Sequence, residues 1–204
     1  MKLGVIGNVD AGKSTLVSVL TKGIEDDGNG SARVRVLNYL HEQETGRTSS
    51  IGHEIMGFDE HGKQILPERF NQNKNKYWKE VVQESHKIVS IVDLCGHEKY
   101  LKTTINGLTG LSPDFGVVIV GANMGMQKMT KEHIGLCLFL KIPFFIVVTK
   151  IDLAPQNKYE ETVTELKKLL KHKLLNKFPI EIKENTPVNV IILFYFRKFK
   201  KSQN

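Results

Sequence analysis

Residues 7–14 constrain this chain more than any other part of the sequence. They read Gly-Asn-Val-Asp-Ala-Gly-Lys-Ser, with two glycines five positions apart followed by lysine and serine. Residues 3–6 before them have the apolar run of a short buried strand, and residues 15–20 after them have the spacing of an amphipathic helix. A glycine-rich loop between strand and helix brings backbone N–H groups close to anionic oxygens. The pattern therefore predicts a phosphate-binding loop.

The last residues of this loop carry its side-chain chemistry. We expect Lys13 to reach the β/γ oxygens of a bound nucleotide and Ser14 to bind Mg²⁺ through its hydroxyl. An ordinary glycine-rich turn is the alternative, and the flanking strand and helix patterns weigh against it. The residues predicted to contact the phosphates are Gly7, Asn8, Val9, Asp10, Ala11, Gly12, Lys13, Ser14 and Thr15.

Length and composition bound the class of protein. A chain of 204 residues is long enough for one α/β domain with a sizeable core. No stretch reaches the roughly 20 apolar residues of a membrane span, and Met1 leads into the first strand without a signal-peptide segment. We therefore expect a cytoplasmic protein that meets no membrane. Cys95 and Cys137 lack metal-binding or redox spacing, so we interpret them as reduced structural thiols.

The net charge of +7 is concentrated near the C-terminus. Residues 1–157 carry 18 basic and 17 acidic side chains, whereas residues 158–204 carry 11 basic and 5 acidic ones. A basic terminal segment can bind nucleic acid by releasing counterions, yet lysine-rich helix faces are more often only solvated. RNA contact through this segment is therefore one of two open interpretations, and no DNA partner is expected.

Apolar runs that alternate with amphipathic stretches set the fold class. The predicted strands after the first are residues 51–58, 88–92, 115–120 and 144–148, and the predicted helices are residues 99–109, 129–140 and 159–175. This alternation favours an α/β fold with a mostly parallel sheet and helices on both faces. Two polar stretches interrupt it: residues 23–46 read as a mobile insertion or a switch, and residues 64–83 as a hydrophilic excursion anchored by Trp78.

Four separate segments resemble the guanine-nucleotide motifs of translational GTPases, the superfamily of elongation factor Tu. They are residues 7–14, Thr48 after Gly-Arg, residues 93–97 (Asp-Leu-Cys-Gly-His) and residues 149–152 (Thr-Lys-Ile-Asp). The loop, Gly-Arg-Thr-Ser-Ser at 46–50, residues 96–104 and Thr-Lys-Glu-His at 130–133 look still more like the GTP-binding protein 1 and 2 family. The resemblance covers residues 3–179. It implies a P-loop NTPase G domain that takes GTP or GDP with Mg²⁺.

The phosphate end of such a site draws on distant segments. Thr48 is expected to join Ser14 on Mg²⁺ only when the γ-phosphate is present, and Asp93, at the carboxyl end of its strand, to hold the ion through water. The N–H of Gly96 is expected to bind the γ-phosphate, so that loss of this phosphate releases the segment. His97 would orient or polarise the attacking water, with Lys13 and Gly96 as the other catalytic residues.

Residues 149–152 are expected to bind the base of the nucleotide. The Asp152 carboxylate can accept two hydrogens from guanine, and adenine presents no such donor pair, so GTP is favoured over ATP. Lys150 would pack its stem over the base, beside Thr149. Asp10 matches a position at which relatives hold a monovalent cation, which is implied by the resemblance alone.

The sequence also departs from the family pattern. Thr149 replaces the usual asparagine, and its hydroxyl offers one short donor where an amide offers two, which predicts weaker guanine affinity. Arg47 stands where elongation factor Tu has an apolar residue, and reads either as an arginine supplied in cis or as a solvent-facing charge. No sequence motif that could bind the O6 atom of guanine follows residue 178, and residues 188–196 read as one substituted edge strand.

These departures shape the domain and function predictions. Residues 1–179 are expected to form the GTP-binding domain, and residues 180–204 an atypical tail in place of its final strand and helix, as in a truncated product. The leading hypothesis is a GTPase that hydrolyses GTP to GDP and phosphate as a switch, with the ribosome or RNA-processing machinery as partner by resemblance. The alternative is a nucleotide-binding module without productive turnover.

Overall fold

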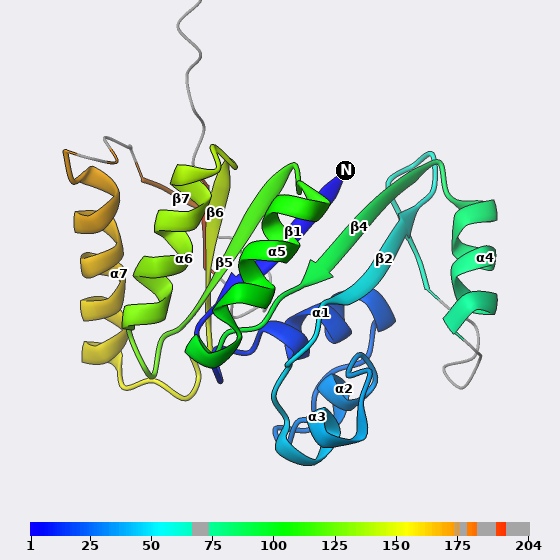
Figure 1. Ribbon diagram of the computed structural model, residues 1–204, viewed down its shortest axis with the longest axis horizontal. Coiled ribbons are helices and arrows are strands. Elements are labelled where there is room, and N and C mark those ends of the chain that lie inside the picture. Colours follow the sequence, from blue (N-terminus) through cyan, green and yellow to red (C-terminus); the bar gives the residue numbers. More distant parts are fainter. Residues whose placement is uncertain (67–73, 174, 176–178, 183–190, 195–204) are drawn as a thin grey trace, which may run out of the picture.

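A computed structural model describes residues 1–66, 74–173, 175, 179–182 and 191–194 (Figure 1). Its strands form one sheet in the order β3-β2-β4-β1-β5-β6-β8-β7. The strands are β1 (Lys2–Gly7), β2 (Gly52–Phe58), β3 (Gln64–Ile65), β4 (Lys87–Asp93), β5 (Phe115–Gly121), β6 (Phe144–Thr149), β7 (Ile180–Ile182) and β8 (Ile191–Phe194). The helices are α1 (Lys13–Lys22), α2 (Ser31–Val34), α3 (Leu40–Thr45), α4 (Lys74–Glu84), the 3₁₀ turn η1 (Glu98–Tyr100), α5 (Leu101–Leu111), α6 (Lys128–Phe139) and α7 (Gln156–Lys171).

The middle of the sheet is parallel, as the alternation of strands and helices predicts. β1 pairs in parallel with β4 on one side and with β5 on the other, and β5 pairs in parallel with β6. The flanking pairs β2–β4, β2–β3, β6–β8 and β7–β8 are antiparallel. The carboxyl ends of β1, β4, β5 and β6 therefore share one edge of the sheet, which is where such folds bind ligands.

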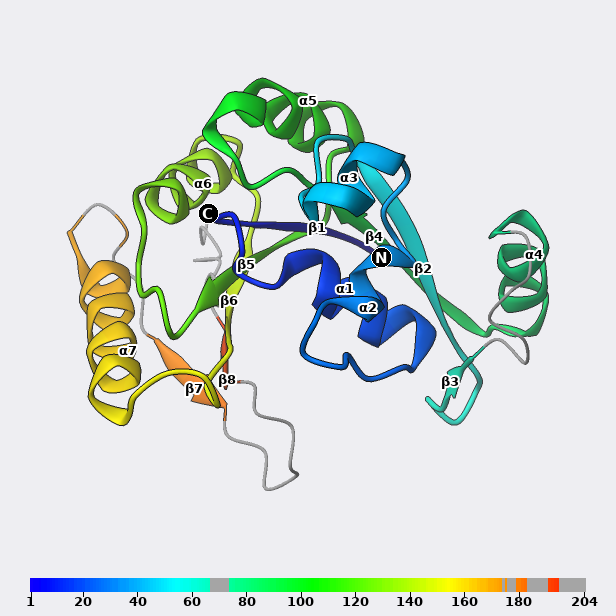
Figure 2. The ribbon, with the colours of Figure 1, turned by 90° about the horizontal axis from the view of Figure 1, so that it is seen from below.

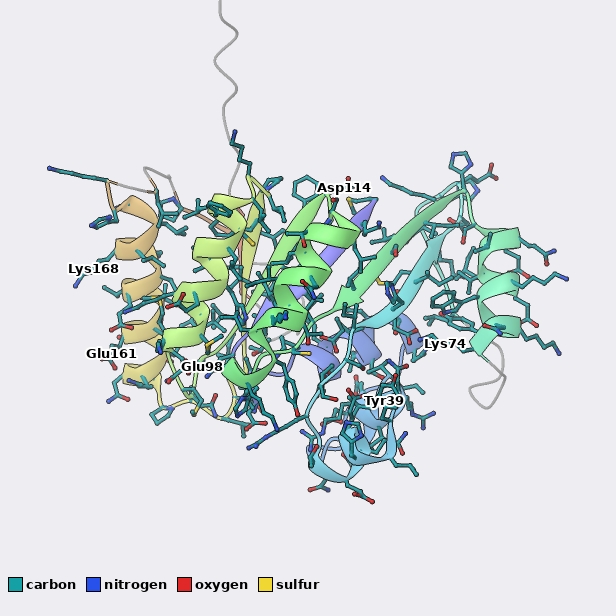
Figure 3. The ribbon with its side chains drawn as sticks, viewed as in Figure 1. Tyr39, Lys74, Glu98, Asp114, Glu161 and Lys168 are labelled. Atoms are coloured by element: carbon teal, nitrogen blue, oxygen red, sulfur yellow. The ribbon has the colours of Figure 1, made fainter. Side chains whose placement is uncertain are left out.

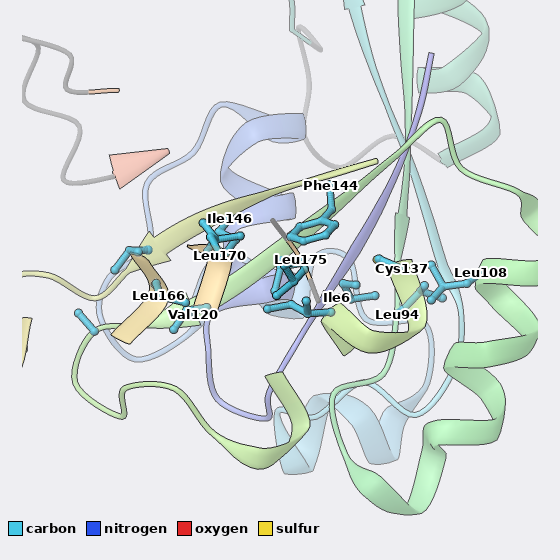
Figure 4. Packing of buried hydrophobic residues seen from close by; sticks show 14 of the residues in the cluster. Ile6, Leu94, Leu108, Val120, Cys137, Phe144, Ile146, Leu166, Leu170 and Leu175 are labelled. Atoms are coloured by element: carbon cyan, nitrogen blue, oxygen red, sulfur yellow. The ribbon is translucent and has the colours of Figure 1, made fainter. Parts of the chain in front are cut away.

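Both faces of the sheet are covered, because successive side chains of each strand point to opposite sides. Ile6 packs with the α5, α6 and α7 side of the core, together with Leu108 and Leu166 (Figure 4). Its neighbour Val5 packs with Val17 of α1 on the other face. Figure 2 shows α1 and α5 on opposite sides of the sheet. The arrangement confirms helices on both faces.

Several elements differ from the sequence-based expectation. The final helix begins at Gln156 and ends at Lys171 rather than spanning 159–175, since α7 is followed by a turn at residues 172–173. Within the hydrophilic excursion, α4 packs Tyr77 and Val81 against Ile55 of β2, with Trp78 partly buried beside them. Lys74 at the start of α4 is labelled in Figure 3. The polar stretch 23–46 contains the short helices α2 and α3.

The end of the sheet also differs. The expected edge strand at 188–196 is described only over Ile191–Phe194, and residues 188–190 and 195–196 lie outside the described residues. β8 is internal to the sheet, because it pairs with β6 on one side and β7 on the other. Two short antiparallel strands thus extend the sheet beyond β6. Among the described residues, none of the helices is both long and apolar enough to cross a bilayer.

Candidate functional site

The phosphate-binding loop runs from the end of β1 to the start of α1. Gly7 has a φ of +146°, and a side chain there would collide with the carbonyl oxygen of Ile119 in the neighbouring β5. Gly12, immediately before α1, has a φ of +85°, a left-handed conformation that glycine adopts without strain. The strand, loop and helix therefore follow one another as residues 3–20 predict. The loop reverses direction at the carboxyl edge of the sheet.

Lys13 lies folded over this loop. Its Nζ donates a hydrogen bond to the Asn8 carbonyl at 2.8 Å, and the residue is only 7% exposed. Burial lowers the pKa of Lys13, and the nearby Asp93 carboxylate opposes that shift. Gly96 presses against the same place, since a Cβ there would overlap Lys13 Nζ and the Gly7 carbonyl oxygen. Residue 96 can approach the loop this closely only as glycine.

Three side-chain oxygens from distant segments meet beside the loop. Ser14 Oγ lies 2.7 Å from Thr48 Oγ1 and donates to Asp93 Oδ2 at 2.6 Å. Asp93 Oδ1 is buried and has no hydrogen-bond partner in the part of the chain that the structure describes. Burial raises the pKa of Asp93 to about 6, against the attraction of the Lys13 ammonium.

This cluster fits Mg²⁺. The ion prefers hydroxyl, carboxylate and water oxygens, and keeps several waters when it also binds phosphates. The unpaired Asp93 Oδ1 is an acceptor ready for a metal-bound water, and a buried polar atom without a partner calls for such an explanation. Ser14 and Thr48 supply the two hydroxyls within hydrogen-bond distance of each other. The donor set therefore suits a magnesium ion held jointly with phosphate oxygens.

An open hollow of about 520 Å³ adjoins the cluster. It is lined by Val9, Asp10, Gly12, Lys13, Ser14, Thr15, Arg33, Gly46, Arg47, Thr48, Gly96, His97 and Lys150. Most residues predicted for the phosphate end are therefore in its wall. Gly7, Asn8, Ala11 and Asp93 are not in the lining, and each contacts or adjoins a residue that is.

His97 lies at the mouth of this hollow with its ring exposed. Its Nδ1 accepts a hydrogen bond from the backbone N–H of Lys99 at 3.0 Å, which caps the 3₁₀ turn η1. The edge of its ring also contacts Tyr100. Because Nδ1 serves as an acceptor, the neutral ring carries its proton on Nε2. Nε2 is therefore a hydrogen-bond donor in this arrangement.

The segment predicted to read the base is arranged differently. Thr149 is buried at the end of β6, and its hydroxyl donates to the Ala11 carbonyl of the phosphate-binding loop at 2.7 Å. Lys150 has a φ of +56° and reaches the lining of the hollow. Asp152 is exposed and is not part of that lining. The structure thus joins Thr149 to the phosphate-binding loop and brings Lys150 to the hollow, whereas Asp152 is outside the lining.

Arg47 and two residues that the sequence analysis did not single out also lie here. Arg47 Nη2 is 3.8 Å from Asp10 Oδ2, in an ion pair whose two side chains are each 55% exposed. Arg33 of α2 lines the same hollow. Glu42 of α3 is completely buried and binds the residues directly after Thr48. The mixed-charge composition of residues 33–44 gives no sign of which charges turn inward.

Comparison with known proteins places the chain among translation-type GTPases. Residues 1–200 match the family described as "Elongation factor Tu GTP binding domain". The chain is 48% identical to GTP-binding protein 1 of Xenopus laevis over 190 residues, which is 93% of this chain and 29% of that protein. It is 46% identical to human GTP-binding protein 2 over 180 residues, which is 88% of this chain and 29% of that protein.

More distant relatives and solved structures agree. Elongation factor 1-alpha of Methanopyrus kandleri is 32% identical over 181 residues, covering 84% of this chain and 36% of that protein. The fold is similar to that of a bacterial selenocysteine-specific elongation factor, EF-Sec, with a TM-score of 0.59 at 23% identity, over 84% of this chain and 23% of that one. The chain thus spans less than a third of the length of the GTP-binding protein 1 and 2 relatives.

Proposed function

The chain belongs to the family of the elongation factor Tu GTP binding domain, and from that premise we propose that it binds Mg²⁺-GTP and hydrolyses it to GDP and phosphate as a molecular switch. The observation that carries the proposal is the meeting of Ser14, Thr48 and Asp93 beside the loop. These residues come from α1, from the segment before β2 and from the end of β4. A metal bound there ties both segments to the phosphates.

The loop and Lys13 would hold the phosphates. Backbone N–H groups at the start of α1 point toward anions, with the positive end of the helix dipole behind them. Lys13 Nζ would exchange its Asn8 carbonyl for the β/γ oxygens, which explains why a lysine is retained in so buried a place. Mg²⁺ would supply charge neutralisation between these oxygens.

Hydrolysis would depend on positioning more than on covalent help. Gly96 would bring its backbone N–H to the γ-phosphate, because no side chain separates it from the loop. His97 is held by its bond from Lys99, with Nε2–H free to polarise or orient groups at the mouth of the hollow. Lys13, Gly96 and His97 are the residues to which we assign the reaction.

Guanine would be read at the other end of the hollow. Lys150 in the lining would place its stem over the base, and the exposed Asp152 carboxylate would close on the guanine N–H donors. Thr149 would act indirectly, because its hydroxyl is already bonded to the loop carbonyl of Ala11. Asp10 would bind a monovalent cation, or would keep the ion pair with Arg47 that it makes in this structure.

The partner would be the ribosome or RNA-processing machinery. The relatedness to elongation factors supports this, and so does the basic excess of residues 158–204. The names of GTP-binding proteins 1 and 2 say only that these relatives bind GTP.

Calorimetric titration of the 204-residue chain with GTP, GDP and ATP in the presence of Mg²⁺ tests the binding step. We expect both guanine nucleotides to bind and ATP to bind far more weakly. Equal affinity for ATP and GTP would contradict the assignment of guanine specificity.

Single-turnover phosphate release, with and without ribosomes, tests the switch. His97→Ala should leave GTP affinity nearly intact and lower stimulated turnover, with His61→Ala, an exposed histidine in the β2–β3 turn, as the matched control. Turnover of the His97 variant equal to that of the control would remove His97 from the mechanism. No phosphate release from the wild-type chain under either condition would favour the nucleotide-binding module without productive turnover.

A further inference from the structure

Glu42 is a completely buried carboxylate in the segment between α1 and β2. Its Oε1 accepts four hydrogen bonds, from the backbone N–H and the hydroxyl of both Ser49 and Ser50, at 2.7–2.9 Å. Its Oε2 accepts a fifth from the backbone N–H of Asn38 at 3.1 Å. No salt bridge to a lysine or arginine is found for it in the described part of the chain. The negative charge is balanced by hydrogen-bond donors.

The residues that Glu42 holds come directly after the metal-binding candidate Thr48. Fixing the amides of Ser49 and Ser50 fixes where the chain carries the Thr48 side chain, which lies 2.7 Å from Ser14 Oγ. The carbonyl of Ser50 in turn accepts a hydrogen bond from Cys95 Sγ at 3.4 Å, next to Gly96. One carboxylate therefore anchors a segment that touches both the metal cluster and the strand end carrying Gly96.

Glu42 is suited to this task as an anion. Burial alone would raise its pKa, but the hydrogen bonds from Ser49 and Ser50 outweigh burial and hold the pKa below its usual range. Hydrogen bonds to an ionised acceptor are roughly twice as strong as bonds between neutral groups. A neutral amide in the same place would keep the shape and lose that strength.

We propose that Glu42 is the positioning residue that sets Thr48 on the metal, and that it thereby favours GTP over GDP at this site. The inference rests on the proposed function and on the expectation that Thr48 contacts Mg²⁺ only when the γ-phosphate is present. A residue that merely stabilised the fold would affect both nucleotides alike. A residue that positions Thr48 affects the triphosphate state selectively, because the diphosphate state does not use the Thr48 hydroxyl.

Glu54 offers a matched control. It is the other buried glutamate among the described residues, 3% exposed, on β2. Its carboxylate pairs with Lys22 at the end of α1 at 2.8 Å and with Lys74 at the start of α4 at 2.9 Å, and within the described residues no ion pair joins it to the segment around Thr48. Glu54→Gln removes a buried charge in the same fold and leaves the contacts of Ser49 and Ser50 intact.

The experiment measures affinities of the 204-residue chain for GDP and for a non-hydrolysable GTP analogue, both with Mg²⁺. Glu42→Gln should lower the affinity for the GTP analogue about tenfold, because a neutral amide accepts weaker hydrogen bonds from Ser49 and Ser50 than a carboxylate does. Its affinity for GDP should stay within about twofold, and Glu54→Gln should leave the ratio of the two affinities unchanged.

A second measurement does not depend on affinity. Hydrogen exchange of the Ser49 and Ser50 amides, with the GTP analogue bound, should be faster in Glu42→Gln than in the wild type and in Glu54→Gln. Equal losses for both nucleotides, an unchanged affinity ratio or unchanged exchange would each overturn the positioning role. A wild-type chain that binds neither nucleotide would overturn the proposed function itself, and this inference with it.

Discussion

The phosphate end and the base end of the hollow are built in different ways. At the phosphate end, Lys13, Ser14 and Asp93 are buried. Lys13 donates to the Asn8 carbonyl of its own loop at 2.8 Å, and Ser14 of α1 donates to Asp93 of β4 at 2.6 Å. At the base end, Lys150 is partly exposed and Asp152 is exposed. The phosphate end is therefore a pre-arranged framework, and the base end is open to solvent.

This difference assigns the two ends separate parts of the binding energy. Buried, hydrogen-bonded charges act in a medium of low dielectric constant, where each contact with a phosphate is strong. Exposed charges are screened by water and salt, so they contribute mainly to the choice between bases. Substitutions at the phosphate end should consequently abolish binding, and substitutions at the base end should redirect it.

The largest effect is expected from Lys13→Ala. Removing one partner of a buried charged contact costs about 2–5 kcal/mol or more, and we expect this variant at the upper end, about 4–5 kcal/mol, where affinity for GTP and GDP falls about a thousandfold or more. Titration calorimetry with Mg²⁺ measures this loss, with Lys102→Ala on the exposed side of α5 as control. Tight GTP binding by the Lys13 variant would contradict the claim that the phosphate end supplies most of the binding energy.

The framework under the phosphate end should also respond to acid. His133 of α6 is fully buried, and neither ring nitrogen has a hydrogen-bond partner within the described residues. Burial lowers its pKa to about 4. The unfolded chain, with an ordinary histidine pKa near 6.5, binds a proton at higher pH than the folded chain does. Stability present above pH 6.5 is therefore lost as the pH falls toward 4, by about 3 kcal/mol at most.

Denaturant unfolding of the wild type and of His133→Leu at pH 7.5 and pH 4.5 checks this. The variant should lose less stability on acidification, because it has no imidazole to protonate. Asp93, whose pKa is raised, acts in the opposite direction, and comparing the two proteins at each pH cancels it. The same loss in both proteins would show that the burial of His133 does not control the acid response.

Local and long-range features of the molecule differ in how far the sequence predicts them. The glycine spacing of residues 7–14 and the apolar runs of β1, β4, β5 and β6 are local signals, and the structure has the expected loop and strands. The role of Glu42 is not a local signal. Its carboxylate accepts hydrogen bonds from Ser49 and Ser50, which reach it only because the chain folds back after α3. The place of β8 inside the sheet is likewise a matter of long-range pairing.

A substitution of Asp152 tests the role of the exposed base end. Asp152→Asn should shift preference from GTP toward xanthosine triphosphate, since an amide offers a donor where the carboxylate offers only acceptors. Loss of charge-assisted hydrogen bonds to the base predicts about a hundredfold weaker GTP binding. Competition titrations with the two nucleotides measure this, and Asp114→Asn, distant from the hollow and labelled in Figure 3, is the control. Unchanged selectivity would mean that another residue reads the base.

The smallest effect is expected from Arg47. It forms an ion pair with Asp10 at 3.8 Å, and both side chains are more than half exposed, so the pair contributes at most about 1 kcal/mol. Arg47→Ala should therefore change GTP affinity by less than about fivefold. An arginine that stabilises charge in the reaction would behave differently, because such groups accelerate phosphoryl transfer by a thousandfold or more without tightening the ground state.

Single-turnover hydrolysis by Arg47→Ala and Arg47→Lys in potassium and in sodium buffers separates these two roles. For a solvent-facing charge, both variants should match the wild type within threefold in either buffer. Potassium dependence that appears only in Arg47→Ala would mean that the guanidinium occupies the position of a cation beside Asp10. A large rate loss in both variants, with affinity intact, would make Arg47 part of the reaction, since a lysine cannot reproduce the planar guanidinium.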